Sequence, residues 1–131
     1  MMTNREIERL AKAALNARKR AYAPYSRYRV GAAVATKGGK VFTGCNVENA
    51  SYGATICAER VAITKAVSEG HRQLRAVAVA TGGKHPAPPC GICLQFMTEF
   101  AEDMPVILVT SGSSEIEVTS LGSLLTYHFK F

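Results

Sequence analysis

Two short segments carry the cysteine pattern of this chain and organise its expected fold. Residues 55–60 read TICAER and residues 88–95 read PPCGICLQ, so Cys57 stands two positions before Glu59 and Cys90 three positions before Cys93. We expect one helix from about residue 56 to 69 and another from about 90 to 102. If the starts of these helices face one another, they bring three thiols together, and the positive end of each helix dipole favours the thiolate form.

The remaining elements surround these two helices. A capping box at Thr3 and Glu6, followed by apolar residues at helical spacing, predicts an amphipathic helix over residues 4–20. Residues 28–48 predict an antiparallel hairpin that turns at Gly38 and Gly39, and residues 75–81, 105–110 and 115–120 predict three further strands. A short helix or turn is expected over 121–129. Strands separated by a helix should run parallel. The order α-β-β-α-β-α-β-β indicates a single α/β domain over residues 1–131, a three-layer α/β/α sandwich with a mixed five-stranded sheet.

Composition limits the class of protein. The chain has 131 residues, 47% of them hydrophobic, which suits one domain with one core. No run approaches the roughly 20 apolar residues of a membrane helix, and the charged N-terminus lacks a secretory signal, so we expect no membrane association. Four cysteines without such a signal favour a reducing compartment, and the cytoplasm is the expected location.

The net charge of +6 does not by itself indicate a nucleic-acid partner. No aromatic residues interleave with the basic residues near the N-terminus, so we interpret these as a solvated helix face. They are Arg5, Arg9, Lys12, Arg18, Lys19 and Arg20.

The spacing of the cysteines leaves several kinds of site open. Cys90 and Cys93 alone resemble a redox pair, and a structural zinc site would recruit Cys45 as a fourth ligand. Three thiolates with an acid nearby favour a catalytic zinc, which keeps one position for water. The pattern [H/C]-x-E followed by P-C-x-x-C is the signature of zinc deaminases, and here it stands as Cys57-Ala58-Glu59 and residues 89–93.

From about Ala21 to Phe129 the chain resembles the short, homotetrameric class of cytidine deaminases. The resemblance rests on the segments YAPYSRYRVGAAV, GCNVENASYGATICAER, PPCGICLQ and LLTYHF. It implies a cytidine deaminase-like fold and one zinc ion per subunit, held by Cys57, Cys90 and Cys93, with Glu59 as proton shuttle. It also implies hydrolytic deamination of cytidine and 2′-deoxycytidine in pyrimidine salvage, by a homotetramer with shared active sites.

The resemblance further implies how the nucleoside is held. Asn46 and Glu48 would hydrogen-bond a ribose hydroxyl, and we expect Glu48 to be a buried carboxylate that needs hydroxyl donors opposite it. The Ala58 backbone N–H would bind the pyrimidine carbonyl, and Arg60 would bond to zinc-ligand sulfur. Tyr28 would pack near the nucleoside. Three further residues would complete the site, partly across a subunit boundary: Ala50, Tyr52 and Phe129.

Three positions depart from the family pattern. Leu94 follows the last cysteine where an arginine is common, Thr126 replaces a proline, and Tyr28 replaces a phenylalanine. Leu94 predicts a more electron-rich zinc. Thr126 leaves open whether the C-terminal contact forms, and Tyr28 leaves open the shape of the base pocket.

Other functions remain open at this level. Tyr28 and Leu94 allow a related deaminase with a different nucleobase or nucleoside analogue as substrate. A nucleic-acid editing deaminase would need an open groove, which Glu48 over the ribose would obstruct. A zinc-stabilised binding module predicts a metal site closed by Cys45 and no role for Glu59.

Overall fold

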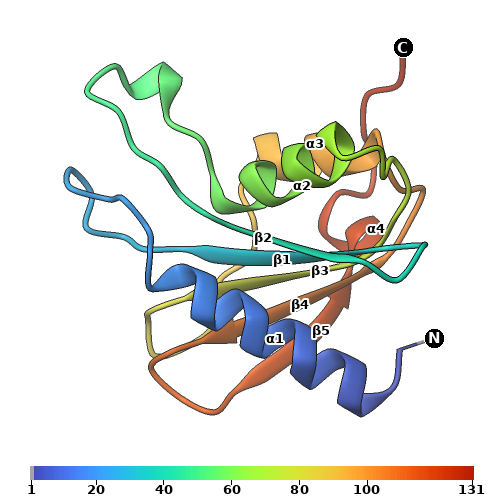
Figure 1. Ribbon diagram of the computed structural model, residues 1–131, viewed down its shortest axis with the longest axis horizontal. Helices are drawn as coiled ribbons and strands as arrows, with labels where there is room; N and C mark the ends of the chain where they lie inside the picture. Colours follow the sequence, from blue (N-terminus) through green and yellow to red (C-terminus); the bar gives the residue numbers. More distant parts are fainter. Residues whose placement is uncertain (1) are drawn as a thin grey trace.

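The computed structural model describes residues 2–131 and places one five-stranded sheet between layers of helices (Figure 1). The sheet has the strand order β2-β1-β3-β4-β5. Its elements are α1 (Asn4–Arg18), β1 (Gly31–Thr36), β2 (Val41–Cys45), the 3-10 turn η1 (Tyr52–Ala54), α2 (Ala58–Ser68), β3 (Leu74–Thr81), α3 (Gly91–Thr98), β4 (Pro105–Thr110), β5 (Ile116–Ser120) and α4 (Leu121–Leu124). The prediction of an α/β fold with a mixed five-stranded sheet is confirmed.

The pairing of the strands follows the helices that connect them. β1 pairs antiparallel with both β2 and β3, whereas β3 and β4, which flank α3, are parallel. β2 and β3 flank α2 and also run in the same direction, but β1 lies between them. β5 closes the other edge, antiparallel to β4.

The two faces of the sheet carry side chains of different size. β1 and β3 present alanines to α1, including Ala33, Ala35, Ala76, Ala78 and Ala80, and these small side chains allow the helix to lie close to the sheet. The opposite face presents Val34, Val77 and Val79 to the layer of α2, α3 and α4. The central strands β1, β3 and β4 are therefore buried and apolar on both faces, as expected for a sheet covered by helices on both sides, whereas the edge strands β2 and β5 are partly exposed.

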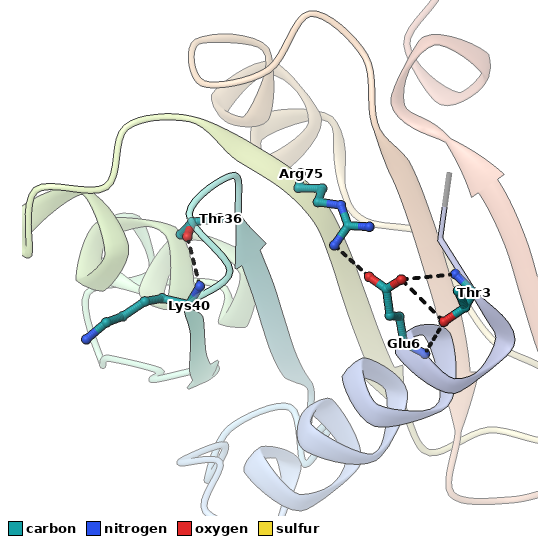
Figure 2. A network of polar contacts seen from close by, with 5 residues as sticks. All are labelled: Thr3, Glu6, Thr36, Lys40 and Arg75. Carbon is teal, nitrogen blue, oxygen red and sulfur yellow. Dashed lines mark hydrogen bonds and ion pairs between the residues drawn. The ribbon is translucent and has the colours of Figure 1, made fainter.

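The start of α1 is fixed by a small polar network, which Figure 2 shows. The Glu6 backbone N–H donates to Thr3 Oγ1 at 3.1 Å, and the Thr3 backbone N–H donates to Glu6 Oε1 at 3.2 Å, which confirms the capping box. Glu6 also forms an ion pair with Arg75 of β3 at 2.6 Å. The cap therefore joins α1 to the central sheet.

Helices α1, α2 and α3 are each shorter than the sequence predicts, and α1 ends at Arg18 rather than at residue 20. α2 begins at Ala58 because Cys57 is its extended N-cap, and Gly70, with φ of +95°, ends that region of the chain. α3 ends at Thr98 rather than near residue 102. The carbonyl of Phe100 accepts a hydrogen bond from Leu74 N at 3.0 Å, so the chain leaves the helix to pair with the start of β3. Within residues 2–131, none of the helices combines the length and apolar character that a membrane crossing requires.

Candidate metal centre and active site

The metal-ligand candidates lie at the starts of two helices of the same layer. Cys57 and Cys90 are the N-cap residues of α2 and α3, both in extended conformation, and neither side chain makes a capping hydrogen bond. Cys93 follows in the first turn of α3. The thiols are therefore free to bind another group, while the helix dipoles favour their ionised form.

The three sulfur atoms form one cluster. The Sγ atoms of Cys57, Cys90 and Cys93 all lie within 4.8 Å of one another, and those of Cys57 and Cys90 are 3.9 Å apart. Tetrahedral zinc with Zn–S distances of about 2.3 Å requires sulfurs separated by about 3.8 Å. The donor set and its spacing therefore fit a zinc ion.

The position of α2 depends on one glycine of β2. A Cβ atom at Gly44 would lie 2.6 Å from Ala62 N and 2.8 Å from Ala58 O. Only the absence of a side chain lets the first turns of α2 rest directly on the strand. This close approach places the segment that carries Cys57 and Glu59.

The loop before Cys90 is also fixed by contacts far away in the sequence. Thr110 Oγ1 donates a hydrogen bond to the Gly83 carbonyl and accepts one from Gly112 N at 3.1 Å. A Cβ at Gly112 would lie 2.4 Å from Gly83 O, so the two loops are in close contact. Sequence reasoning missed Thr110 and Gly112, because nothing in their local pattern points to residue 83.

The thiols influence one another in the folded protein. The hydrogen bond with Cys93 and the Arg60 guanidinium lower the pKa of the Cys57 thiol, whereas the hydrogen bond to Cys57 and burial raise the pKa of Cys93. Arg60 Nη2 lies 3.4 Å from Cys57 Sγ. A thiolate at Cys57 therefore has three hydrogen-bonding partners, Cys90, Cys93 and Arg60, before any metal binds.

Glu59 occupies the second position of α2, beside this cluster, and is only 3% exposed. Burial raises the pKa of its carboxyl to about 7 from the usual 4.5, and the charge of Cys57 acts in the same direction. The group can therefore exchange a proton near neutral pH, which suits general acid–base chemistry.

Asn46 and Glu48 lie next to this centre on a short bridging segment. Val47, between them, pairs with Ile56 through two backbone hydrogen bonds of 2.9 and 3.0 Å, one residue before Cys57. Asn46 is 8% exposed and its side chain binds backbone, with Oδ1 accepting from Val30 N and Nδ2 donating to Tyr28 O.

The expectation of a buried Glu48 is wrong. Glu48 is half-buried and lines an open pocket of about 340 Å³ together with Tyr25, Ser26, Asn49, Tyr52 and Thr55. Its carboxylate is satisfied within the chain, by the Ser26 hydroxyl and the Tyr25 and Ser26 backbone N–H groups. The Ser26 hydrogen bond is the main cause of a lowered pKa at Glu48.

The other nucleoside-contact candidates differ in exposure. Tyr28 is 50% exposed, Tyr52 77% and Phe129 71%, and Ala50 is exposed as well, so these side chains are available to a further molecule. Ala58 is buried at the first position of α2, where its N–H has no partner within the helix.

Gln95 of α3, which the sequence did not single out, holds the C-terminal segment through hydrogen bonds of 3.0 and 3.2 Å to the backbone of Phe129.

The remaining sequence candidates lie outside the cluster. Among residues 2–131 the sulfur cluster contains three cysteines, and Cys45, at the end of β2, is not one of them. Leu94 is buried and packs in the apolar core beneath α2 and α3. Thr126 is exposed after α4.

Three thiols with zinc spacing and a buried acid two residues after the first cysteine, on an α/β/α sandwich, define a zinc-dependent deaminase. Comparison with known proteins agrees: the family described as "Cytidine and deoxycytidylate deaminase zinc-binding region" matches residues 4–110. The chain belongs to this family, and the resemblance predicted from its sequence is confirmed, as is zinc as its metal.

Similar proteins cover most of the chain. A cytidine deaminase of Halalkalibacterium halodurans is 47% identical over 116 residues, 88% of each chain. A probable cytidine deaminase of Dictyostelium discoideum is 50% identical over 114 residues, covering 86% of this chain and 77% of the relative. The crystal structure of cytidine deaminase from Burkholderia pseudomallei superposes with a TM-score of 0.89 at 46% identity, covering 98% of this chain and 100% of the other.

Proposed function

We propose that this chain catalyses hydrolytic deamination of cytidine and 2′-deoxycytidine, giving uridine or 2′-deoxyuridine and ammonia. The observation that carries the proposal is the buried Glu59, whose pKa is raised to about 7, beside the cluster of three thiols. The names of the similar proteins support cytidine as the nucleoside.

Cys57, Cys90 and Cys93 would hold the zinc ion. When bound, zinc supplies Lewis acidity that lowers the pKa of coordinated water towards about 7. Arg60 offsets part of the negative charge of the thiolates through its contact with Cys57 Sγ. Since Leu94 is apolar, Arg60 is the basic residue next to the motif that performs this role.

Glu59 serves as base and then as acid. It accepts a proton from the attacking water and delivers it to ring N3, which makes C4 of the base more electrophilic. After the oxygen has added to C4, Glu59 passes the second proton to the amino group, which leaves as ammonia. A pKa of about 7 lets one carboxyl take and give protons at neutral pH.

The open pocket lined by Glu48 and Thr55 would hold the sugar of the nucleoside, since Thr55 lies two residues before Cys57. Ala58 N–H would bind the pyrimidine carbonyl, and Asn46 and Glu48 would hydrogen-bond a sugar hydroxyl. The Asn46 side chain also holds the backbone of Tyr28 and Val30. A site that contacts the 3′-hydroxyl side accepts ribose and deoxyribose alike, so both nucleosides are expected as substrates.

We also propose that the protein is a cytoplasmic homotetramer that acts in pyrimidine salvage. The exposed side chains of Tyr52 and Phe129 support shared active sites, because each is large, mostly apolar and free of contacts that would bury it. Light scattering coupled to gel filtration tests this: a mass of four chains is expected, and a monomer at active concentrations would contradict it.

The chemistry is tested by product analysis. Zinc-loaded protein should convert cytidine to equal amounts of uridine and ammonia, and removal of zinc by a chelator should abolish the reaction until zinc is restored. A protein that holds one zinc per chain but leaves cytidine and deoxycytidine unchanged would overturn the proposed substrate.

A further inference from the structure

Ser26, in the loop between α1 and β1, directs its side chain at the carboxylate of Glu48. Its hydroxyl donates to Glu48 Oε2, while the backbone N–H groups of Tyr25 and Ser26 donate to Oε1 at 2.9 and 3.1 Å. Two consecutive residues therefore hold one carboxylate at three points. The backbone donors fix Oε1, and the Ser26 hydroxyl alone sets the position of Oε2.

The hydroxyl hydrogen of Ser26 has a defined direction. Tyr28 N donates to Ser26 Oγ at 3.0 Å, so the oxygen is the acceptor in that bond and its single hydrogen is directed to Glu48. Arg27, between these residues, has a φ of 60°, a conformation that non-glycine residues seldom adopt. It turns the chain back within a few residues, while Arg27 N donates to the Ala23 carbonyl at 2.9 Å.

The count of hydrogen bonds leaves one acceptor position on this carboxylate. Oε1 accepts two N–H groups and Oε2 accepts one hydroxyl, so one lone pair of Oε2 remains. Glu48 and Ser26 both line the open pocket, and Thr55, two residues before Cys57, lines it as well. A lone pair held in place at this pocket is suited to accept a hydroxyl of a bound molecule.

We propose that Ser26 is a positioning residue: its hydroxyl orients Glu48 so that the remaining acceptor position receives the 3′-hydroxyl of the nucleoside sugar and selects against sugars that lack it. The inference rests on the proposed function, because that function supplies the nucleoside. The Ser26 hydrogen bond also lowers the pKa of Glu48, which keeps this carboxylate ionised as an acceptor.

Equilibrium binding separates this role from a general structural one. Calorimetric titrations with cytidine and with 3′-deoxycytidine would use zinc-loaded protein carrying Glu59→Gln, so that conversion of bound nucleoside is at least about a hundredfold slower. We expect cytidine to bind at least about tenfold more tightly than 3′-deoxycytidine, since loss of a hydrogen bond to a charged acceptor has about this effect. Adding Ser26→Ala should weaken cytidine binding about fivefold and change 3′-deoxycytidine binding by less than about twofold.

Two further variants complete the experiment. Ser26→Thr retains the hydroxyl and should preserve the preference for cytidine. Ser68→Ala, at the far end of α2 from Cys57, removes a serine whose hydroxyl bonds only within its helix and should leave both affinities unchanged. Zinc content and the circular dichroism spectrum of each variant identify any that fail to fold.

Equal weakening of both nucleosides by Ser26→Ala, or tighter binding of cytidine, would overturn the inference. The first result assigns Ser26 a structural role, and the second shows that its hydroxyl competes with the sugar. Deamination by the parent protein is measured separately: absence of turnover refutes the proposed function, whereas the ratio of affinities still decides the role of Ser26. If neither nucleoside binds, both proposals fail.

Discussion

Replacing Glu59 by Gln should change how the stability of the metal-free protein depends on pH. The Glu59 side chain is 3% exposed, and its pKa is raised from 4.5 to about 7, mainly by burial. A carboxylate at this position has lost most of its hydration, whereas glutamine has almost the same shape and carries no charge.

The pKa values give the sign and the size of the effect. The unfolded chain releases the Glu59 proton near pH 4.5, whereas the folded protein retains it up to about pH 7. Unfolding therefore becomes easier as pH rises between these values, because the folded state binds more protons in that range. The difference of about 2.5 between the two pKa values corresponds to about 3 kcal/mol of unfolding free energy. The parent protein loses all of this contribution once the pH is above about 7.

Urea unfolding at one protein concentration, with chelator and reductant present, measures this effect. The free energy of unfolding of Glu59→Gln minus that of the parent should rise by about 3 kcal/mol between pH 4.5 and pH 8. Glu8→Gln alters an exposed carboxyl of α1 and should show a change below about 0.5 kcal/mol. A constant difference for Glu59→Gln across this range would refute the reasoning that burial governs this carboxyl.

Three further predictions concern the surroundings of the site. Gly44→Ala should lower the free energy of unfolding by about 1–3 kcal/mol and weaken zinc affinity in a chelator competition, because the new Cβ would meet α2. Gly53→Ala is the matched control, since the space around Gly53 is open, and equal effects of the two substitutions would contradict the packing argument. Arg60→Gln should raise the pKa of the Cys57 thiol in metal-free protein, followed by thiolate absorbance in the ultraviolet, whereas an unchanged titration would show that the guanidinium has no effect on this thiol. Glu6→Gln should reduce the loss of stability on acidification below pH 4.5, because Arg75 lowers the pKa of Glu6 and the ion pair is lost when the Glu6 carboxylate of the folded protein is protonated. If the unfolding free energies of variant and parent fall in parallel with pH, the ion pair makes no such contribution.

The sequence predicted most clearly what local chemistry determines. The capping box at Thr3, the turn at Gly38 and Gly39, and the order of helices and strands depend on short patterns, and these give the layered fold. The three thiols could be assigned to one centre because Cys57-Ala58-Glu59 and residues 89–93 match the signature of zinc deaminases.

Contacts between distant segments could not be predicted in the same way. α3 ends early because Phe100 bonds to Leu74, and the loop before Cys90 is fixed by Thr110. Glu48 was expected to be buried and to need outside donors, yet Ser26, 22 positions earlier in the chain, supplies a hydroxyl to it. No local pattern specifies such a partner, because it depends on how the loop from α1 to β1 folds over the pocket.

The roles of the exposed residues were the hardest to predict, both from the sequence and from the structure of a single chain. Tyr28, Tyr52 and Phe129 have the sizes and positions that the resemblance implies, but a single chain leaves them largely in contact with solvent. Their roles depend on the nucleoside and on neighbouring subunits, so they remain proposals.

The most direct test of the central claim is the rate of ultraviolet absorbance loss when zinc-loaded protein is mixed with cytidine, compared between the parent and Glu59→Gln. Our account predicts steady turnover by the parent and a loss of at least about a hundredfold in the variant, with zinc content unchanged, because Glu59 moves both protons. Turnover by Glu59→Gln close to that of the parent would contradict the assignment of Glu59 as the proton carrier of this site.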